Sequence, residues 1–362
     1  MTQLRYRLLG RSGLRVAQLA LGTMTFGLQD EWGTDAAEAG RIYQSYREAG
    51  GNYIDTANQY AGGASEAIVG RLVAGHREEV VIASKYTNSA PGRGANAGGN
   101  QRKNMTESVE QSLRRLGTDY LDLYIAHAWD HFTPAEEVMR AFDDLVRAGK
   151  VLYIGVSNTP AWVVAKSNTL AELRGWTRYV GLQIEYSLLA RDAERELLPM
   201  AADQEMSVIA WSPLKNGLLT GKYLTERAEP GRLDSQYFRS ALLAQVSQGG
   251  DQAGDTVRAV ADVAAETGSA PAQVALAWLM HRPQPVIPVA GARTLAQFRQ
   301  NLPAADLALT AGQLSRLDAV SRGSLGFPHD YLNGDLSRGF RTGGLYDQII
   351  PRRAACEAAI DG

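Results

Sequence analysis

The chain has 362 residues, of which 45% are hydrophobic and 21% are charged, and its formal net charge is −2. This balance excludes a globally disordered chain and gives no electrostatic basis for nucleic-acid binding. The single cysteine, Cys356, excludes an internal disulfide framework and a cysteine-rich metal site. We expect a cytoplasmic protein, because charges interrupt the first apolar residues and no apolar run is long enough to span a bilayer.

Short apolar runs alternate with helical patterns along the chain. Eight of these runs are predicted to be strands: 16–21, 52–55, 80–85, 121–127, 151–157, 179–185, 207–212 and 285–290. Most are continuously apolar, which is typical of strands that are covered on both faces. Eight strands separated by helices favour a single-domain (β/α)8 TIM barrel over an open sheet, with a core at about residues 15–320.

Two of the helices can be predicted residue by residue. Asn104 is expected to cap the first helix and Gly117 to end it, while the second begins near Ala135 and ends before Gly149. Apolar stripes predict their buried sides: Met105, Val109, Leu113 and Leu116 in the first helix, and Val138, Phe142, Leu145 and Val146 in the second.

Three segments lie outside this alternation. Residues 5–9 and 14–16 flank a Gly-containing turn and predict a hairpin ahead of the first barrel strand. Residues 214–254 form a long connection after the seventh strand, and loops of this length are usually functional or disordered. The tail at residues 322–362, rich in Gly, Arg and aromatic residues, is predicted to be irregular.

Four polar residues lie at or just after predicted strand ends: Asp55, Tyr60, Lys85 and His127. In a TIM barrel the C-terminal strand ends form the active-site mouth, so these side chains are expected to meet there. A carbonyl that accepts a hydride needs a proton donor, and tyrosine, with a pKa of about 10, is a reluctant one. Lys85 is expected to lower the pKa of Tyr60, Asp55 to hold Lys85, and neutral His127 to orient the carbonyl.

Each of these residues also has a plain structural explanation. Asp55 alone is typical of a cap, Lys85 of a solvated strand end, and Tyr60 of packing. His127 with Asp130 and His131 suggests a metal site, but the glutamate of the zinc-protease helix motif is missing, so no metal is predicted. The separate explanations require four coincidences on three successive strand ends. We therefore favour the interpretation that the four residues form one functional site.

At these residues the chain resembles the aldo-keto reductases, over about residues 4–320. The motifs that carry the resemblance are DTANQY, VIASKY, LDLYIAHAWD, IGVSN, LQIEYSLLAR, WSPLKNGLLTGKY and PVAGARTLAQFRQNL. The form WSPL…GLLTGKY is most similar to the branch with bacterial reductases and potassium-channel β-subunits. The resemblance implies a (β/α)8 barrel, NADPH, and the same four roles in a catalytic tetrad. Because the channel subunits differ at the histidine position, His127 favours a working reductase.

The sequence contains no Gly-x-Gly-x-x-Gly after a strand and no P-loop, so a nicotinamide cofactor must be held in another way. The resemblance implies that it lies extended across the barrel mouth. Ser157, Asn158 and Gln183 suit its carboxamide, and Trp211 offers a flat face for its ring. A belt over the pyrophosphate is predicted at Ser212, Pro213, Leu214, Lys215, Asn216 and Lys222. Asp55, Thr23 and Met24 are expected to touch the cofactor from other parts of the rim.

A second group of residues is predicted to bind the adenosine 2′-phosphate. Arg293, Gln297 and Asn301 are spaced by four residues, so they share a face of a helix that starts near Thr294. An arginine at a helix N-terminus suits a phosphate, which favours NADPH over NADH. From the spacing alone a solvated helix face is the better explanation, and the family motif around these residues reverses that order. Gly291 permits close backbone approach.

Four positions depart from, or match only loosely, the pattern of the relatives. Lys215 and Asn216 replace small belt residues, which predicts an added phosphate contact or altered loop closure. Gln300 stands where relatives often have Glu, an adenine contact. Arg232 matches a position that closes over the cofactor in some relatives.

The substrate pocket is predicted from side chains just beyond the strand ends: Met24, Trp32, Tyr60, Tyr86, His127 and Trp129. The resemblance implies that the tail walls this pocket with Phe327, Tyr331, Phe340 and Tyr346. Such an aromatic wall suits a bulky or cyclic carbonyl compound, while plain packing is the alternative for each residue.

Three functions follow from these residues. The favoured one is an NADPH-dependent oxidoreductase that reduces an aldehyde or ketone to an alcohol, acting on CH–OH groups in reverse. A redox-sensing subunit that binds NADPH with little turnover is the alternative, and the intact tetrad argues against it. A barrel isomerase or aldolase with a Lys85 Schiff base would not need Trp211 or Arg293. The expected partner is a small carbonyl compound; the oligomeric state stays open, a homo-oligomer included.

Overall fold

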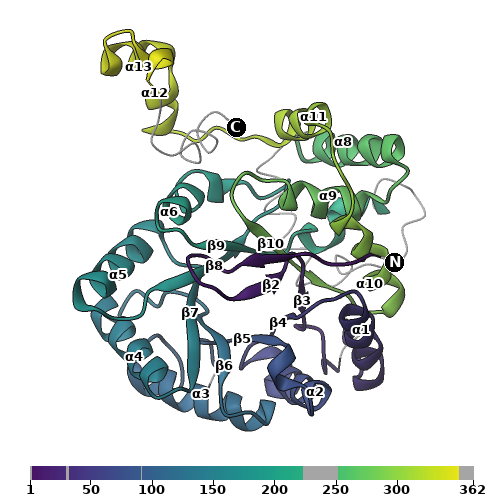
Figure 1. Ribbon diagram of the computed structural model, residues 1–362, viewed down its shortest axis with the longest axis vertical. Coiled ribbons are helices and arrows are strands. Elements are labelled where there is room, and N and C mark those ends of the chain that lie inside the picture. Colours follow the sequence, from purple (N-terminus) through teal and green to yellow (C-terminus); the bar gives the residue numbers. More distant parts are fainter. Residues whose placement is uncertain (1, 30–31, 91, 223–251, 350–362) are drawn as a thin grey trace.

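A computed structural model describes residues 2–29, 32–90, 92–222 and 252–349, and its centre is a closed barrel of eight parallel strands (Figure 1). The strands follow chain order around the barrel, and the last one pairs with the first to close it. They are β3 (Ala20–Gly22), β4 (Tyr53–Asp55), β5 (Val81–Tyr86), β6 (Leu121–Ala126), β7 (Val151–Ser157), β8 (Tyr179–Glu185), β9 (Ser207–Trp211) and β10 (Val286–Gly291). The predicted (β/α)8 TIM barrel is confirmed.

Helices surround the barrel and cover the outer faces of its strands (Figure 1). The α-helices of this layer are α1 (Ala36–Glu48), α2 (Ala64–Val73), α3 (Arg102–Leu116), α4 (Ala135–Arg147), α5 (Ala161–Arg174), α6 (Leu197–Asp203), α8 (Gln252–Thr267), α9 (Pro271–Met280), α10 (Leu295–Asn301) and α11 (Ala311–Ser321). Short 3₁₀ turns join them: η1 (Tyr60–Gly63), η2 (Arg77–Glu79), η3 (Asp192–Glu194), η4 (Lys215–Thr220) and η7 (Leu302–Ala305).

Alternation along each strand separates the barrel interior from the helical layer. One buried cluster fills the interior and takes one residue in two from the strands, such as Tyr53, Val81, Ala83 and Ile125. Successive side chains point to opposite faces of a strand. Asp55, Lys85 and His127 each lie two positions beyond an inward-facing residue, so they continue these inward rows to the C-terminal mouth. The period of the strands therefore aims the predicted site residues at the mouth.

A hairpin closes the opposite end of the barrel. Its strands are β1 (Tyr6–Leu8) and β2 (Arg15–Ala17), and Leu9 and Val16 belong to the interior cluster. Gly10 has a φ of 54° and donates its N–H to Ser207 Oγ at 2.7 Å, at the start of β9. The hairpin is confirmed, but Val16 belongs to it and not to the first barrel strand. That strand begins only at Ala20, after the chain leaves β2.

The two helices predicted in detail are present, with one correction. Helix α3 begins at Arg102, earlier than expected, because the side chain of Gln101 caps it by accepting the N–H of Asn104 at 2.9 Å. Gly117 ends it in the left-handed conformation as predicted. The predicted inner faces are buried in both α3 and α4, except for Val146, which is partly buried against the core.

The long connection and the tail differ in how much of them is described. Residues 223–251, which include the predicted cofactor residue Arg232, lie outside the described residues, and α8 already starts at Gln252. The tail is not wholly irregular: it forms α12 (His329–Asn333), α13 (Asp335–Thr342) and η8 (Tyr346–Gln348). An extended Gly334 allows α13 to start and a left-handed Gly343 ends it. These short helices lie outside the ring around the barrel (Figure 1).

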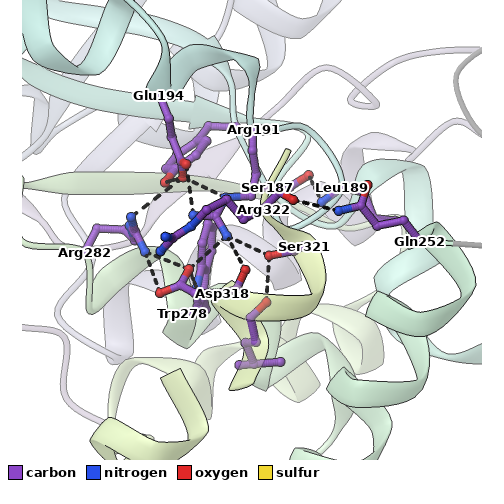
Figure 2. Close-up of polar contacts among 12 residues, drawn as sticks. Ser187, Leu189, Arg191, Glu194, Gln252, Trp278, Arg282, Asp318, Ser321 and Arg322 are labelled. Carbon is purple, nitrogen blue, oxygen red and sulfur yellow. Dashed lines mark hydrogen bonds and ion pairs between the residues drawn. The ribbon is translucent and has the colours of Figure 1, made fainter. Parts of the chain in front are cut away.

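A charged network fastens the segment after β8 to the helical layer. Figure 2 shows Arg191, Arg282, Glu194 and Asp318 converging around Trp278. The two guanidinium groups lie 5.2 and 4.9 Å from the indole centroid, and the Asp318 carboxylate pairs with both. The network joins the β8–α6 segment to α9 and α11. Within the described residues, no helix combines the length and apolarity that crossing a membrane demands.

Candidate active site

Lys85 is the centre of a polar cluster at the C-terminal mouth. Its Nζ atom donates to Asp55 Oδ1 at 2.6 Å, to the backbone oxygen of Thr56 at 2.7 Å and to Tyr60 Oη at 3.1 Å. The lysine side chain is fully buried, and these contacts use all three donors of the ammonium group. The structure thus brings together three of the four predicted tetrad residues in direct contact.

The loop after β4 brings Tyr60 over Lys85. The N–H groups of Thr56 and Asn58 donate to the oxygens of Ala83 and Lys85, so the loop first follows β5. The chain then turns at η1, where Ala61 has a left-handed φ of 49° and is followed by two glycines. This turn fixes the phenol above the ammonium group.

Burial and charge act in opposite directions on the two groups. For Lys85, burial is the largest influence and lowers the pKa, but Asp55 and Tyr60 together raise it above its ordinary value, so the ammonium form is kept. For Tyr60, burial raises the pKa more than Lys85 lowers it, and the net pKa is above 10. Lys85 does lower the pKa of Tyr60, as expected, but desolvation of the phenolate outweighs the nearby charge, so the net shift is upward.

His127 completes the tetrad and is neutral. Burial, assisted by the positive charge of Lys85, lowers the pKa of His127 to about 3. Its ring lies edge-on to that of Tyr60 with a centroid distance of 6.0 Å. Its buried Nδ1 atom has no hydrogen-bond partner among the described residues. A neutral imidazole carries one N–H donor, as the predicted orienting role requires.

Asp55 is held by more than the lysine. Gln183 Nε2 donates to Asp55 Oδ2 at 2.6 Å, and Thr23 Oγ1 donates to the backbone oxygen of Asp55 at 2.9 Å. The sequence predicts both residues only as cofactor contacts. The sequence did not suggest that Gln183 orients Asp55. The position of Gln183 among the inward-facing residues of β8 is the feature from which this role could have been predicted.

The predicted carboxamide residues lie together at the ends of β7 and β9. Asn158 Nδ2 donates to the backbone oxygen of His127 at 2.9 Å, and Trp211 Nε1 donates to Asn158 Oδ1 at 3.1 Å. Ser157 Oγ is buried and lacks a hydrogen-bond partner among the described residues. A buried hydroxyl without a partner fits a site that awaits a polar ligand group, so these residues suit a nicotinamide carboxamide.

The predicted belt has an unusual backbone and an internal ion pair. Ser212, Lys215 and Asn216 have left-handed φ values of 53°, 45° and 53°, and Gly217 follows at 95°. Lys215 Nζ donates to Glu185 Oε1 at 2.6 Å, and the lysine side chain is only 4% exposed. The belt lysine is thus paired with a carboxylate, not presented as a free charge for a phosphate. The other predicted belt residues flank this turn: Pro213, Leu214 and Lys222.

Of the residues predicted to bind the 2′-phosphate, Arg293 and Gln297 are in contact, but Asn301 does not share their exposed surface. Gln297 Oε1 accepts the backbone N–H of Arg293 at 3.0 Å, and the Arg293 guanidinium lies 4.7 Å from the ring centroid of Trp32. Gln297 and Gln300 are exposed, whereas Asn301 is buried at the end of α10. Helix α10 has seven residues and Thr294 as its N-cap, as expected. Gly291, the last residue of β10, is exposed at the mouth.

The predicted substrate residues divide into two groups. Met24 and Trp129 lie at the rim and are partly exposed, while Trp32 is buried beneath Arg293. Tyr86 does not line the mouth: it is fully buried and packs against Tyr124 and Phe142 in the helical layer. The prediction for Tyr86 is wrong because Lys85 points inward, so the next residue points outward.

The described part of the tail gives no contact with the tetrad. Its predicted aromatic residues Phe327, Tyr331 and Phe340 are largely exposed. The tail touches the barrel rim near α6, where His329 Nε2 lies 2.9 Å from Glu196 Oε1. A tail that walls the substrate site therefore stays a prediction. The described residues also contain no group of three or more His, Cys, Asp or Glu side chains arranged to hold a metal ion.

The barrel and the tetrad at its mouth together define an oxidoreductase of carbonyl compounds. The chain belongs to the Aldo/keto reductase family, whose sequence pattern matches residues 18–322. The resemblance recognised in the motifs is therefore confirmed.

Several relatives match over nearly their whole length. A norsolorinic acid reductase of Aspergillus flavus is 35% identical over 353 residues, which cover 93% of this chain and 86% of the relative. A norsolorinic acid reductase B of Dothistroma septosporum is 34% identical, with 93% and 87% covered. An aryl-alcohol dehydrogenase [NADP(+)] of Phanerodontia chrysosporium is 36% identical, with 88% and 86% covered.

Proposed function

We propose that this protein is an NADPH-dependent reductase of aldehydes or ketones in which Tyr60 donates the proton. The observation that carries the proposal is the contact of buried Lys85 with both Asp55 and Tyr60 at the mouth of the barrel. A neutral His127 beside Tyr60 adds a hydrogen-bond donor for a carbonyl oxygen.

The residues at the mouth suit a nicotinamide cofactor. The buried hydroxyl of Ser157, which has no hydrogen-bond partner in the described part of the chain, and the neighbouring amide of Asn158 would hold the carboxamide, with Trp211 beside them. When bound, the reduced nicotinamide supplies the hydride. The Arg293–Gln297 pair at the start of α10 supports the preference for NADPH, as does the NADP(+) in the printed name of one relative.

The chain's own residues handle the proton. As negative charge develops on the carbonyl oxygen, the Tyr60 hydroxyl donates its proton there and the resulting phenolate remains beside the Lys85 ammonium. Asp55 keeps that ammonium charged and in place, and His127 orients the carbonyl by hydrogen bonding. Burial raises the pKa of Tyr60, so the phenol carries its proton at neutral pH, and the charge of Lys85, which acts in the opposite direction, favours release of that proton to the carbonyl oxygen.

The test is NADPH and NADH oxidation by the purified protein with aromatic, aliphatic and sugar aldehydes and ketones. Tyr60→Phe should lower kcat by at least about 10²-fold, the scale of general acid catalysis. Tyr120→Phe is the matched control, because this tyrosine precedes β6 at the opposite end of the barrel. Tight NADPH binding without turnover on any carbonyl would instead favour the redox-sensing alternative. Equal losses of kcat in Tyr60→Phe and Tyr120→Phe would show that Tyr60 is not the proton donor.

A further inference from the structure

Asn100 is a buried asparagine that joins the chain segments after β5 and β6. Its Nδ2 atom donates to the backbone oxygen of Ala128 at 2.8 Å and to Thr87 Oγ1 at 3.0 Å. Its Oδ1 atom accepts the N–H of Asp130 at 2.8 Å, and its own N–H donates to Asp130 Oδ2 at 2.7 Å. Asn100 is 3% exposed, so these bonds are shielded from water, and they use both amide donors. We call Asn100 and Thr87 the clamp.

The clamp holds the backbone on both sides of His127. Thr87 Oγ1 accepts the N–H of His127 at 3.2 Å, and Asn100 binds the first and third residues after it. The backbone oxygen of His127 is held separately by Asn158 Nδ2, at 2.9 Å. The amide N–H of His127 and the segment that follows it therefore depend on the clamp.

The backbone of the clamp is strained. Thr87 has a φ of 92°, which is an outlier for a β-branched residue, and its backbone oxygen accepts the N–H of Gly99 at 2.8 Å. Gly99 has a φ of 90°, and a Cβ at this position would lie 3.0 Å from Asp130 Oδ2. A glycine therefore lets the chain bring Asn100 close to the end of β6. Strain that the surrounding contacts maintain is concentrated at functional sites.

The imidazole of His127 depends on its backbone for its position. Its buried Nδ1 atom makes no hydrogen bond within the described ranges, so that atom does not fix the ring. The ring packs edge-on against Tyr60. A hydrogen-bond donor that acts in catalysis must be held within about 0.5 Å of its productive place. Contacts that fix the backbone of His127 therefore bear directly on where its N–H meets a carbonyl oxygen.

We infer that Asn100 is a positioning residue for carbonyl reduction, and that it acts by fixing the backbone of residues 127–130. The inference rests on the proposed reductase function, in which His127 orients the carbonyl. The side chain of Asn100 spends its bonds on Thr87 and on backbone groups, so it acts on the reaction through His127. Its loss should misplace the imidazole and leave the other three tetrad residues in contact.

The first experiment measures NADPH oxidation with benzaldehyde in Asn100→Leu, which keeps the branched shape of the side chain and removes its hydrogen bonds. We expect kcat to fall about 10-fold, while the Kd for NADPH changes less than about 2-fold. Asn168→Leu is the matched control. Asn168 is also buried and bonds the N–H of Tyr179, but at the start of β8, so its loss should cost stability and not kcat.

A double variant tests whether Asn100 acts through His127. In the His127→Gln background, Asn100→Leu should lower kcat by less than about 2-fold more, because the group that it positions is already gone. Thr87 offers a smaller change for the case that Asn100→Leu does not fold. Thr87→Val removes the hydroxyl that accepts from both Asn100 and His127 and should lower kcat about 3- to 10-fold, whereas Thr87→Ser keeps the hydroxyl and should retain kcat.

Nuclear magnetic resonance of the protein labelled with ¹⁵N-histidine reads the imidazole without any turnover. The signals of His127 are those lost in His127→Gln. They should shift in Asn100→Leu and in Thr87→Val and stay in place in Asn168→Leu.

Two results would overturn the inference and leave the reductase standing. One is that the signals of His127 are the same in Asn100→Leu as in the wild type. The other is that Asn100→Leu lowers kcat as much in the His127→Gln background as in the wild type. If the wild type turns over no carbonyl, the proposed function fails, and shifted signals would still show that Asn100 places His127.

Discussion

Lys215, the first residue of η4, pairs with Glu185, the last residue of β8, at 2.6 Å between Nζ and Oε1. The ion pair tethers a turn in which three consecutive residues have left-handed backbones to a rigid strand end. Its effect is to hold the segment that we expect to cover the cofactor pyrophosphate. We therefore expect the lysine to act on a bound cofactor through the backbone of the belt.

Removing this tether should weaken cofactor binding and leave the chemistry intact. In Lys215→Met the belt gains conformational freedom that binding must remove, so the Kd for NADPH should rise about 3- to 10-fold. Quenching of tryptophan fluorescence measures the Kd, and Lys166→Met, an exposed lysine on α5, is the control. Glu185→Gln should have a similar effect, and the double variant should be no worse than the stronger single one. An additive double variant would mean that the two residues act independently.

Asp55→Asn should move the pH dependence of kcat. Burial lowers the pKa of Lys85, and Asp55 is the main group that raises it again. Without this carboxylate the lysine pKa falls, so the ammonium is lost at a lower pH and Tyr60 loses its stabilising charge. We expect kcat to fall by about 10²-fold and its alkaline limit to shift to lower pH.

The pH profile of kcat with an aryl aldehyde measures this shift. Asp119→Asn, an exposed aspartate at the opposite end of the barrel, should match the wild type. An unchanged alkaline limit in Asp55→Asn would show that Asp55 does not set the charge state of Lys85.

His127 should make the fold less stable in acid. Its pKa is about 3 in the folded protein and 6.5 as an ordinary value, so between these pH values the unfolded chain binds a proton that the folded chain does not. The stabilising contribution is therefore complete above about pH 6.5 and declines as pH falls toward 3, with a slope of at most about 1.4 kcal/mol per pH unit. Urea unfolding from pH 4.5 to 7.5 should show a smaller slope for His127→Gln, and equal slopes would contradict the prediction.

The Asp318 network should contribute strongly to stability. Asp318→Asn leaves the guanidinium groups of Arg191 and Arg282 with Glu194 as their remaining carboxylate, in a region where all these side chains are less than one-fifth exposed. We expect the free energy of unfolding to fall by about 2–4 kcal/mol. Denaturant unfolding measures it, and Asp255→Asn, from an exposed pair with Arg258, should change little. A loss of unfolding free energy no larger than in this control would show that the network contributes no more to stability than an exposed ion pair does.

The barrel was predictable because its signals are local. Continuous apolar runs, helix caps and glycine ends are written in neighbouring residues. All eight predicted strands exist, and seven of them have boundaries within one residue of those expected, whereas the first begins at Ala20 and not at Val16. The errors occur where a local sequence pattern is compatible with two structures. Val16 is apolar and extended in either arrangement, and the chain path after β2 assigns it to the hairpin. Asn104 is a good cap, but Gln101 caps the helix first.

The tetrad was predictable by residue type, since each member follows an apolar run that ends at the same mouth. Its electrostatics were not. The sequence places a lysine and a tyrosine in one site, but only their burial decides that the pKa of Tyr60 is raised and not lowered. Desolvation depends on the surrounding atoms, which come from many strands and loops.

The sequence by itself determined the family, the alternation of strands and helices, and which four side chains are candidates for catalysis, because each depends on short motifs and spacing. The tertiary structure alone decided that Tyr86 faces the helices, that Lys215 pairs with Glu185 and that Trp162 meets Trp129. Each of these contacts joins two chain segments whose separation in the sequence carries no information about their distance in space. They arise only when the barrel closes and brings the strand ends to one mouth.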